Sequence, residues 1–460
     1  MTDANWNGRQ VLVLGLGDTG LSCIRWLARH GARLRAADTR IEPPALEVVR
    51  AGFPACELVL GRFEAEALLP GVDTIAASPG IALRDPLLVE AKRRGIEIVG
   101  DVEIFARALR LLGNARPRMI GITGTNGKST VTAMAGGMCR AAGLRTVVAG
   151  NIGLPVLDAL RAAEDAGQPD INVVELSSYQ LETTSSLDLD CATVLNVTQD
   201  HLDRYDGIAD YARAKERIFG NATTRLVNRD DEWSRAMGRE SGTISFGGGL
   251  PKGARDYGID AARDCLVQGS YALIGMGEVA VPGRHNALNA LAASALVREA
   301  GVLAGAAFDG LRRFPGLPHR TAFVAEANGV RFYDDSKGTN VGATLAALEG
   351  FAQPVVLIAG GDGKGQDFAP LRPVVLEHAR AVVLIGRDTP AIEAALQGPG
   401  VTLVRAGDME DAVAKAASLA RPGDAVLLSP ACASFDMFRN YSHRGEAFAA
   451  AARAVAGAGH

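Results

Sequence analysis

The chain has 460 residues, of which 48% are hydrophobic and 22% are charged, and its formal net charge is -4. This composition excludes a disordered chain, the small negative charge excludes a general attraction to nucleic acid or anionic membranes, and no apolar stretch approaches the roughly 20 residues of a membrane span. The polar first residues lack the apolar core of a signal peptide, so we expect a cytoplasmic protein. The six cysteines form no C-x-x-C pair, so we expect neither a zinc ribbon nor a disulfide framework. The length predicts about three domains of roughly 150 residues each.

The first hundred residues alternate strand patterns with helix patterns. A continuous apolar run at 11–17 is typical of a strand that is buried on both faces, and 33–40 and 72–80 are predicted as further strands that end in loops. A helical pattern follows the first of these strands at 19–31. Such alternation predicts a parallel sheet covered by helices.

A glycine motif stands between the first strand and the first helix. Gly15, Gly17 and Gly20 fit G-x-G-x-x-G, and Asp38 ends the next strand 18 residues further on. This arrangement offers helix N-terminal N–H groups to a diphosphate and a carboxylate to a ribose or base. We therefore expect a nucleotide or dinucleotide ligand here. The alternative is a purely structural glycine turn, and the motif alone does not separate NAD from another diphosphate-linked nucleotide.

The stretch GITGTNGKST, residues 121–130, resembles a phosphate loop with a shifted start. The strict form has a glycine where this chain has Ile122, although the Gly-Lys-Ser ending is present. The stretch follows a predicted strand at 118–122 and precedes a helix that extends to about residue 142. Lys128 can neutralise phosphate charge, and a hydroxyl of Ser129 or Thr130 can bind Mg²⁺. A chance glycine-rich turn is the alternative.

Two further predicted strands, 171–178 and 191–198, carry polar residues at their ends. Glu175 lies at the end of the first, and Asp200 and His201 follow the second. A carboxylate at such a strand end could hold Mg²⁺ directly or through water. A lone Glu or His is more often structural, but two such ends beside a phosphate loop favour a metal site. Lys215, by its helical context alone, is typical of a solvated surface lysine.

A third set of strands and helices follows the central region. Weak β patterns occupy 222–283, a helix is predicted at 285–301, and the two prolines of 314–320 suit a linker. Four apolar runs then each end in a polar loop, which predicts a third α/β domain. Two of these loops contain Lys337 and Lys364, which suit a substrate with carboxylate groups. Ordinary polar loops are the alternative.

Taken together, these stretches closely resemble the Mur ligases, the ATP-dependent amino-acid ligases of peptidoglycan precursor synthesis. That family's phosphate loop has the form T-G-T-N-G-K-S/T, so Ile122 is ordinary within it. The shared motifs occur in family order over nearly the whole chain: GNIGLP, ELSSYQLE, NVTQDHLDRY, LPHR, DDSKGTN, GGDGK and SPACAS. SPGIAL, with the pairing of DSKGTN and SPACAS, favours the branch that adds D-glutamate, and the D-N-P-R signature of the branch that adds a diamino acid does not occur in the sequence.

The resemblance implies an α/β protein of three domains. These would be a Rossmann-like N-terminal domain at 1–100 that binds the UDP substrate, a central P-loop ATPase domain at 101–316, and a Rossmann-like C-terminal domain at 317–460 that binds the amino acid. The implied activity is ATP-dependent ligation of D-glutamate to UDP-N-acetylmuramoyl-L-alanine through an acyl phosphate, with release of ADP and phosphate. The implied cofactors are two Mg²⁺ ions and CO₂, held as a carbamate on Lys215. We expect a monomer that binds no nucleic acid and inserts into no membrane.

The same resemblance implies the site residues. The catalytic set would be Lys128, Glu175, His201 and Lys215. The metal set would be Ser129, Glu175, His201 and the carbamate of Lys215. ATP would contact Gly124, Thr125, Asn126, Gly127, Lys128, Ser129, Thr130, Asn289, Arg320, Asp335 and Lys337. The UDP substrate would contact Gly17, Asp18, Thr19, Asp38, Thr39, Arg40, Ser78, Gly80, Asn151, Ser177, Gln180 and His201. D-Glutamate would contact Thr339, Lys364, Ser434, Phe435 and Tyr441, of which the last two stand where the family has leucine and phenylalanine.

Three other functions remain as alternatives. An NAD-dependent dehydrogenase would use residues 15–20 but leave 121–130 unexplained. A folylpolyglutamate synthetase-like ligase shares the central chemistry, but the glycine motif of the first domain fits it poorly. A nucleotide-binding regulator without catalysis is a third class, which measurable phosphate release with both substrates would exclude.

Overall fold

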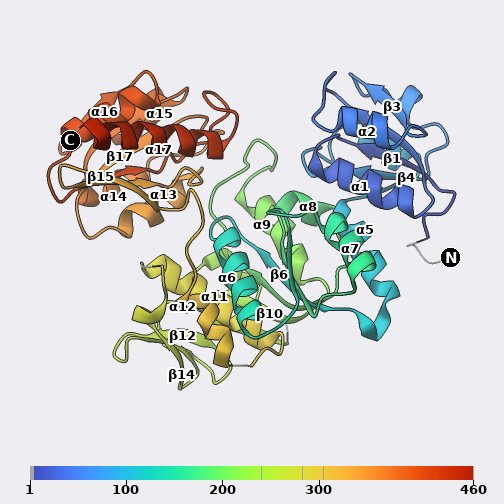
Figure 1. Cartoon of the computed structure of the whole chain (residues 1–460), viewed down its shortest axis with the longest axis horizontal. Helices are drawn as coiled ribbons and strands as arrows, with labels where there is room; N and C mark the ends of the chain where they lie inside the picture. Colours follow the sequence, from blue (N-terminus) through green and yellow to red (C-terminus); the bar gives the residue numbers. More distant parts are fainter. Residues whose placement is uncertain (1–4, 240, 282, 304, 459–460) are drawn as a thin grey trace. The chain divides into compact units, whose positions relative to one another are not determined.

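The computed structural model describes residues 5–239, 241–281, 283–303 and 305–458. The chain forms two compact units. The first unit comprises Met1–Asn196, Tyr211–Met276 and Ala290–Arg312, and the second comprises Val197–Asp210, Gly277–Asn289 and Arg313–His460. Both units contain sheets covered by helices (Figure 1), so the predicted α/β class is confirmed.

The first sheet, in the first unit, has five parallel strands in the order β3-β2-β1-β4-β5. Its strands are β1 (Gln10–Leu14), β2 (Arg33–Asp38), β3 (Glu57–Leu60), β4 (Thr74–Ala77) and β5 (Glu97–Val99). Its helices are α1 (Asp18–Arg29), α2 (Leu46–Gly52), α3 (Ala65–Leu68), α4 (Pro86–Arg93) and α5 (Asp101–Leu111). The strand order reverses between β1 and β4. In doubly wound sheets, ligands bind outside the carboxyl ends of the strands at such a point.

The second sheet, also in the first unit, has six parallel strands in the order β11-β10-β9-β6-β8-β7. Its strands are β6 (Arg118–Thr123), β7 (Thr146–Gly150), β8 (Ile171–Glu175), β9 (Leu189–Val194), β10 (Ala222–Asn228) and β11 (Thr243–Phe246). Its helices are α6 (Lys128–Ala141), α7 (Val156–Ala166), α8 (Ser178–Glu182), α9 (Ile208–Glu216), α10 (Glu232–Ala236), α11 (Arg284–Glu299) and α12 (Asp309–Arg312). The central strand β6 leads directly into the predicted phosphate loop.

A small antiparallel sheet follows in the region of weak β patterns. It consists of β12 (Tyr257–Asp260), β13 (Cys265–Gln268) and β14 (Tyr271–Gly275). Tyr257 is buried, and its hydroxyl donates to Glu299 of α11 at 3.1 Å. This contact attaches the small sheet to the central part of the first unit.

The third large sheet forms the core of the second unit, in the order β15-β16-β20-β17-β18-β19. Its strands are β15 (Ala322–Ala327), β16 (Val330–Asp334), β17 (Val355–Gly360), β18 (Ala379–Ile385), β19 (Leu403–Arg405) and β20 (Ala425–Leu428). Its helices are α13 (Val341–Glu349), α14 (Leu371–His378), α15 (Thr389–Leu396), α16 (Met409–Leu419) and α17 (Tyr441–Ala458). Only the pair β15–β16 is antiparallel; the other pairings are parallel.

Alternate residues of β17 explain why its sequence is apolar throughout. Val355 and Leu357 pack against α13, α14 and α15, whereas Val356 and Ile358 pack against α16 and α17. Successive side chains of a strand point to opposite faces, so a strand covered on both sides must be apolar at every position. Figure 1 shows α16 and α17 together on one side of this sheet. No helix in the described part of the chain is long and apolar enough to span a membrane.

Candidate functional site

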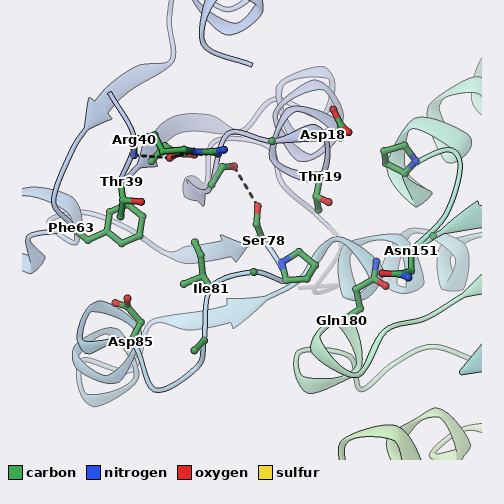
Figure 2. A pocket seen from close by; sticks show the side chains of 18 of the residues that line it. Asp18, Thr19, Thr39, Arg40, Phe63, Ser78, Ile81, Asp85, Asn151 and Gln180 are labelled. Atoms are coloured by element: carbon green, nitrogen blue, oxygen red, sulfur yellow. Dashed lines mark hydrogen bonds and ion pairs between the residues drawn. The ribbon is translucent and has the colours of Figure 1, made fainter. Parts of the chain in front are cut away.

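A pocket of about 690 Å³ opens at the carboxyl ends of β1, β2 and β4 in the first unit. Ten of the twelve predicted UDP-substrate residues line it: Gly17, Asp18, Thr19, Asp38, Thr39, Arg40, Ser78, Gly80, Asn151 and Gln180. Ser177 is not among the lining residues but forms a capping box with Gln180 at the start of α8, and His201 belongs to the second unit. Figure 2 shows that Asn151, which follows β7, and Gln180 of α8 lie at the same pocket as the side chains that follow the strands of the first sheet.

The glycine motif has the geometry that a phosphate site needs. Gly15 has a φ of 89°, and a Cβ there would meet Ser78 Oγ at 2.8 Å. A Cβ on Gly20 would meet the carbonyl oxygen of Gly15 at 1.8 Å. Only Gly17, the N-cap of α1, has open space where its Cβ would lie. A ligand can therefore approach the N-terminal N–H groups of α1 at Gly17, which is how helix N-termini bind phosphate.

Asp38 holds Arg40 beside the pocket. Its Oδ1 accepts from the Arg40 N–H and Nε, both at 2.9 Å, and its Oδ2 accepts from Arg40 Nη2 and the Leu16 N–H, both at 2.7 Å. Burial acts to raise the pKa of Asp38, but these hydrogen bonds outweigh it and lower the pKa to about 2. The pair therefore stays ionised at neutral pH, and the Arg40 guanidinium is fixed in orientation.

The structure resolves the shifted start of the phosphate loop. Ile122 is fully buried in β6, so it belongs to the sheet core, and the loop begins at Gly124, whose φ is 155°. Gly127 has a φ of 82° and is the N-cap of α6. Lys128 Nζ donates to the carbonyl oxygens of Gly124 and Thr125 at 2.8 Å each, so the lysine crosses over the loop. The loop thus brings a cation and helix N–H groups together, as a phosphate cradle requires.

Asn196, which was not singled out from the sequence, fixes the other side of this loop. Its carbonyl oxygen accepts from the Thr125 N–H at 2.9 Å, and its Oδ1 accepts from the Asn126 N–H at 2.8 Å. Its Nδ2 in turn donates to the Asn126 carbonyl oxygen at 3.1 Å. Asn196 lies just after β9 in the motif LNVTQDH. That motif could have indicated the contact, because β9 and β6 are neighbouring strands.

Glu175 is placed to bind a cation. It ends β8, is 1% exposed, and accepts from Asn151 Nδ2 at 2.7 Å through Oε1. Its Oε2 is buried and, within the described residues, has no hydrogen-bond partner. A buried carboxylate oxygen without a partner costs stability, and a hard cation such as Mg²⁺ would satisfy it. The residues therefore fit a metal, although no group of three or more His, Cys, Asp or Glu in the described chain forms a preformed metal cluster.

Lys215 is not a surface residue, so the interpretation from its helical context alone is wrong. Its side chain is 1% exposed, its Nζ donates to the Gly124 carbonyl oxygen at 2.9 Å, and the Tyr211 ring centre lies 4.3 Å from Nζ. The lysine thus reaches the same loop carbonyl as Lys128 does. Two of the predicted catalytic residues, Lys128 and Lys215, therefore meet at one carbonyl oxygen of the phosphate loop.

In the second unit, Asp200 joins three loops. Its Oδ1 accepts from the His201 N–H at 2.9 Å and lies 3.3 Å from Lys364 Nζ, and its Oδ2 accepts from Asn340 Nδ2 at 3.3 Å. His201 has a φ of 56° and Lys364 a φ of 51°, which are strained values for residues with a side chain. Such strain is often found at functional sites.

Of the predicted amino-acid residues, Thr339, Lys364, Ser434 and Phe435 lie on loops after β16, β17 and β20, and Tyr441 begins α17. Ser434 is buried, whereas Phe435 is 73% exposed. Lys337 Nζ lies 5.1 Å from the ring centre of Tyr441. Asp335 accepts from Ser429 Oγ at 2.7 Å and from the Thr321 N–H at 3.1 Å. Burial raises the pKa of Asp335 to about 7, although these hydrogen bonds act to lower it.

The predicted ATP and metal residues divide between the two units. The first unit holds the phosphate loop with Ser129, Glu175 and Lys215, and the second holds His201, Asn289, Arg320, Asp335 and Lys337. Within the first unit, Phe63, Ile81 and Asp85 also line the pocket and were not expected from the sequence. Phe63 follows the edge strand β3, and no motif marks it.

Three family models match the chain. The Mur ligase MurD-like N-terminal domain matches residues 9–100, the Mur ligase middle domain matches 122–297, and the Mur ligase glutamate ligase domain matches 319–432. Among curated proteins, two named UDP-N-acetylmuramoylalanine–D-glutamate ligase, from Methylobacillus flagellatus and Nitrosospira multiformis, are each 54% identical to this chain. The first alignment covers 96% of both chains, and the second covers 98% of this chain and 96% of the relative.

Solved structures share the fold at low identity. The UDP-N-acetylmuramate-alanine ligase from Thermotoga maritima has a TM-score of 0.60 at 18% identity and covers 97% of this chain and 99% of its own. The MurF ligase from Thermotoga maritima, solved in complex with ADP, has a TM-score of 0.59 at 16% identity. The match covers 98% of this chain and 96% of the MurF chain. The near-complete coverage by close relatives, together with the three family models, leads to one conclusion. The chain belongs to the Mur ligase family.

Proposed function

We propose that this protein is the ATP-dependent ligase that joins D-glutamate to UDP-N-acetylmuramoyl-L-alanine in peptidoglycan precursor synthesis, releasing ADP and phosphate. Relatives at 48–54% identity over nearly the full chain carry the name of this activity. The glycine motif, the phosphate loop and the lysine-bearing loops of the second unit supply the kinds of groups that the reaction needs.

One contact supports this proposal most directly. Asn151 lines the pocket and also donates to Glu175 at 2.7 Å. Glu175 ends β8, which pairs with β6 so that Ile122 lies opposite Glu175. The pocket thus reaches Asn151, whose side chain binds the carboxylate at the end of the strand next to β6. A substrate with its nucleotide over Gly17 and its carboxylate near Glu175 would present that carboxylate to ATP.

The chain's residues have distinct tasks in this reaction. Lys128 neutralises phosphate charge while the γ-phosphoryl group passes to the alanyl carboxylate, since phosphoryl transfer depends on charge stabilisation and positioning. The resulting acyl phosphate is attacked by the amine of D-glutamate, and inorganic phosphate leaves as the amide bond forms. Thr39 and Arg40 contact the uracil end, and Asp38 holds Arg40 in place. Lys364, Thr339 and Ser434 bind the D-glutamate carboxylates, with Phe435 and Tyr441 beside them.

Two Mg²⁺ ions complete the site in this proposal. Glu175, Ser129, His201 and a carbamate on Lys215 would hold them, and the metals supply charge neutralisation for phosphoryl transfer. The Lys215 geometry is compatible with a carbamate, because a carbamate keeps one N–H that can donate to the Gly124 carbonyl oxygen. The nucleotide contacts assigned to Asn289, Arg320, Asp335 and Lys337 belong to the same proposal.

We further propose domain boundaries at 1–100, 101–316 and 317–460, a monomeric state and a cytoplasmic location. The three family models support the division because their matched ranges fall within these boundaries. A cytoplasmic location follows from the substrates, because ATP and UDP-linked precursors are found there.

Phosphate release tests the proposal. With ATP, Mg²⁺ and UDP-N-acetylmuramoyl-L-alanine present, D-glutamate should trigger release, whereas L-glutamate, L-alanine and a diamino acid should not. Equal turnover with L-alanine would contradict the assignment of the amino acid. Absence of release with every amino acid of the panel would instead favour a nucleotide-binding regulator.

A further inference from the structure

Arg444 is the largest fully buried side chain among the described residues. It lies in the first turn of α17, and each guanidinium nitrogen donates a hydrogen bond. Nε donates to Ser336 Oγ at 3.0 Å, Nη2 to the Ser336 carbonyl oxygen at 2.8 Å, and Nη1 to the Cys432 carbonyl oxygen at 3.0 Å. The planar guanidinium therefore binds two separate loops at once, a geometry that a lysine cannot reproduce.

The loops that Arg444 joins are those that carry the proposed ligand contacts. Ser336 lies between Asp335 and Lys337 in the loop after β16, and Cys432 lies two residues before Ser434 in the loop after β20. The loop after β17 also lies close to the guanidinium: a Cβ built on Gly361, the first residue of that loop, would be 3.3 Å from Arg444 Nη1. The guanidinium is thus hydrogen-bonded to two loops and lies close to a third at the carboxyl edge of one sheet.

The contacts of Ser336 extend this connection to the rest of the second unit. Ser336 Oγ donates to the Tyr441 carbonyl oxygen at 2.8 Å, and the Ser336 N–H donates to Asp334 Oδ1 at 2.9 Å. Asp334 Oδ2 lies 2.7 Å from His319 Nδ1. The start of α17, the loop after β16 and the LPHR segment are therefore parts of one hydrogen-bonded network.

Burying a charged group is costly, so this arrangement needs a compensating role. Burial lowers the pKa of Arg444 to about 10, while neighbouring acidic groups act to raise it, so the cation persists at neutral pH. A buried charge contributes little to net stability compared with apolar packing. Its benefit here is geometric, because three fixed donors define the relative positions of the loop backbones.

We propose that Arg444 is a positioning residue that sets the loop after β16 and the loop after β20 relative to each other, so that Lys337 and Ser434 face their ligands in a fixed geometry. The proposal rests on the function proposed above for these loops. It assigns to Arg444 no contact with substrate.

The test compares Arg444→Lys with two control variants in the full-length protein. Phe448→Leu removes packing from a fully buried position on α17 and leaves the hydrogen-bonding groups of Arg444, Ser336 and Cys432 in place. Arg453→Lys makes the same chemical change at an exposed position of the same helix. Arg444→Lys should raise the KM for D-glutamate by at least about tenfold, the change that 1.4 kcal/mol makes. The KM for UDP-N-acetylmuramoyl-L-alanine should stay within about twofold, and both controls should resemble the wild type in the two KM values.

Hydrogen exchange provides a readout that is independent of activity. In Arg444→Lys, exchange should be faster in peptides that cover 334–340 and in peptides that cover 429–435, whereas Phe448→Leu should change exchange in α17 and in the elements of its core cluster but not in both loops. Faster exchange in only one loop, or the same KM and exchange changes in Phe448→Leu, would overturn the proposal. If the wild type releases no phosphate with D-glutamate, the proposed function fails. The hydrogen-exchange measurement still tests whether Arg444 positions the two loops.

A milder variant covers the case in which Arg444→Lys does not fold. Ser336→Ala removes one acceptor of the guanidinium and the donor to Tyr441 but leaves the arginine in place. It should change exchange in both loops in the same direction, by a smaller factor. Unchanged exchange in both loops would contradict the proposal.

Discussion

Asn151 Nδ2 donates to Glu175 Oε1 at 2.7 Å and thereby orients a carboxylate whose other oxygen is buried without a hydrogen-bond partner among the described residues. Asn151 comes from the loop after β7, and Glu175 comes from the end of β8. Two neighbouring strand ends therefore combine a residue of the pocket with a residue suited to a cation. In the function proposed above, this is the point at which substrate binding meets phosphate chemistry.

Glu175→Gln should abolish Mg²⁺-dependent turnover while leaving the protein folded. The amide is nearly isosteric and can still accept from Asn151, but it lacks the charge that a hard cation prefers. We expect phosphate release to fall by at least about a hundredfold. Release is measured against Mg²⁺ concentration, and thermal unfolding checks the fold. Glu349→Gln, at an exposed position, is the control. Wild-type Mg²⁺ dependence in Glu175→Gln would remove this residue from the metal site.

Lys128→Ala should nearly abolish turnover without weakening the binding of the UDP substrate. Lys128 Nζ donates to the loop carbonyl oxygens of Gly124 and Thr125, and Lys128 is not among the residues that line the pocket. We expect a loss of roughly a hundredfold or more in phosphate release, since charge stabilisation dominates phosphoryl transfer. Titration calorimetry with the UDP substrate provides the comparison. A loss of affinity beyond about tenfold, or roughly 1.4 kcal/mol, would argue against separate sites.

Lys215 should carry a carbamate derived from CO₂. Carbon-13 NMR of protein equilibrated with labelled CO₂ should show a carbamate signal that Lys215→Ala lacks. Lys215→Ala should be inactive, and acetate should restore part of its activity, because a small carboxylate can replace the lost anion. Lys215→Arg should stay inactive because it keeps the wrong charge. Identical spectra for wild type and Lys215→Ala, or full activity in Lys215→Arg, would leave Lys215 as a buried cation.

The free energy of unfolding should depend on the ionisation of Asp335. Burial raises its pKa from 3.8 to about 7, so the folded state holds a proton that the unfolded state releases above about pH 4. Stability from this group is therefore fully present below the unfolded pKa and is lost as the pH rises through about 7, by roughly 4 kcal/mol or less. Asp335→Asn should weaken the decline between about pH 4 and about pH 7 in urea unfolding of the ligand-free protein. An unchanged slope would indicate that Asp335 titrates normally.

The sequence predicted the central strands of each sheet and failed at the edges. The strands β1, β6, β8, β17 and β20 are mainly apolar because helices cover both of their faces. By contrast, β3, β5, β7, β15 and β19 are edge strands that are partly exposed. An edge strand needs no continuous apolar run, so its sequence resembles that of a loop. The hydrophobic pattern therefore could not reveal the edge strands.

In the candidate site, too, some residues could be predicted from the sequence and others could not. Motif residues such as Gly15, Lys128 and Glu175 could be assigned because strand ends and glycine loops impose recognisable spacings. Phe63 could not be assigned, because a lone aromatic residue after an edge strand carries no pattern. The burial of Lys215 is a tertiary property, and its helix pattern alone suggested a solvated side chain. Arg444 was missed for the same reason, since nothing in the sequence around it marks an arginine as buried.

The acceptor positions of the Asp38 carboxylate are all occupied by hydrogen bonds within the protein, and this has a consequence for the design of inhibitors. A carboxylate offers about four acceptor positions, and Arg40 and the Leu16 N–H occupy two at each oxygen. A cationic inhibitor aimed at Asp38 would have to displace Arg40 and would gain little. Thr39 and Phe63 also line the pocket near Arg40 (Figure 2). A neutral, flat heterocycle with hydrogen-bond acceptors is therefore the better lead compound, and added basicity should not improve its affinity.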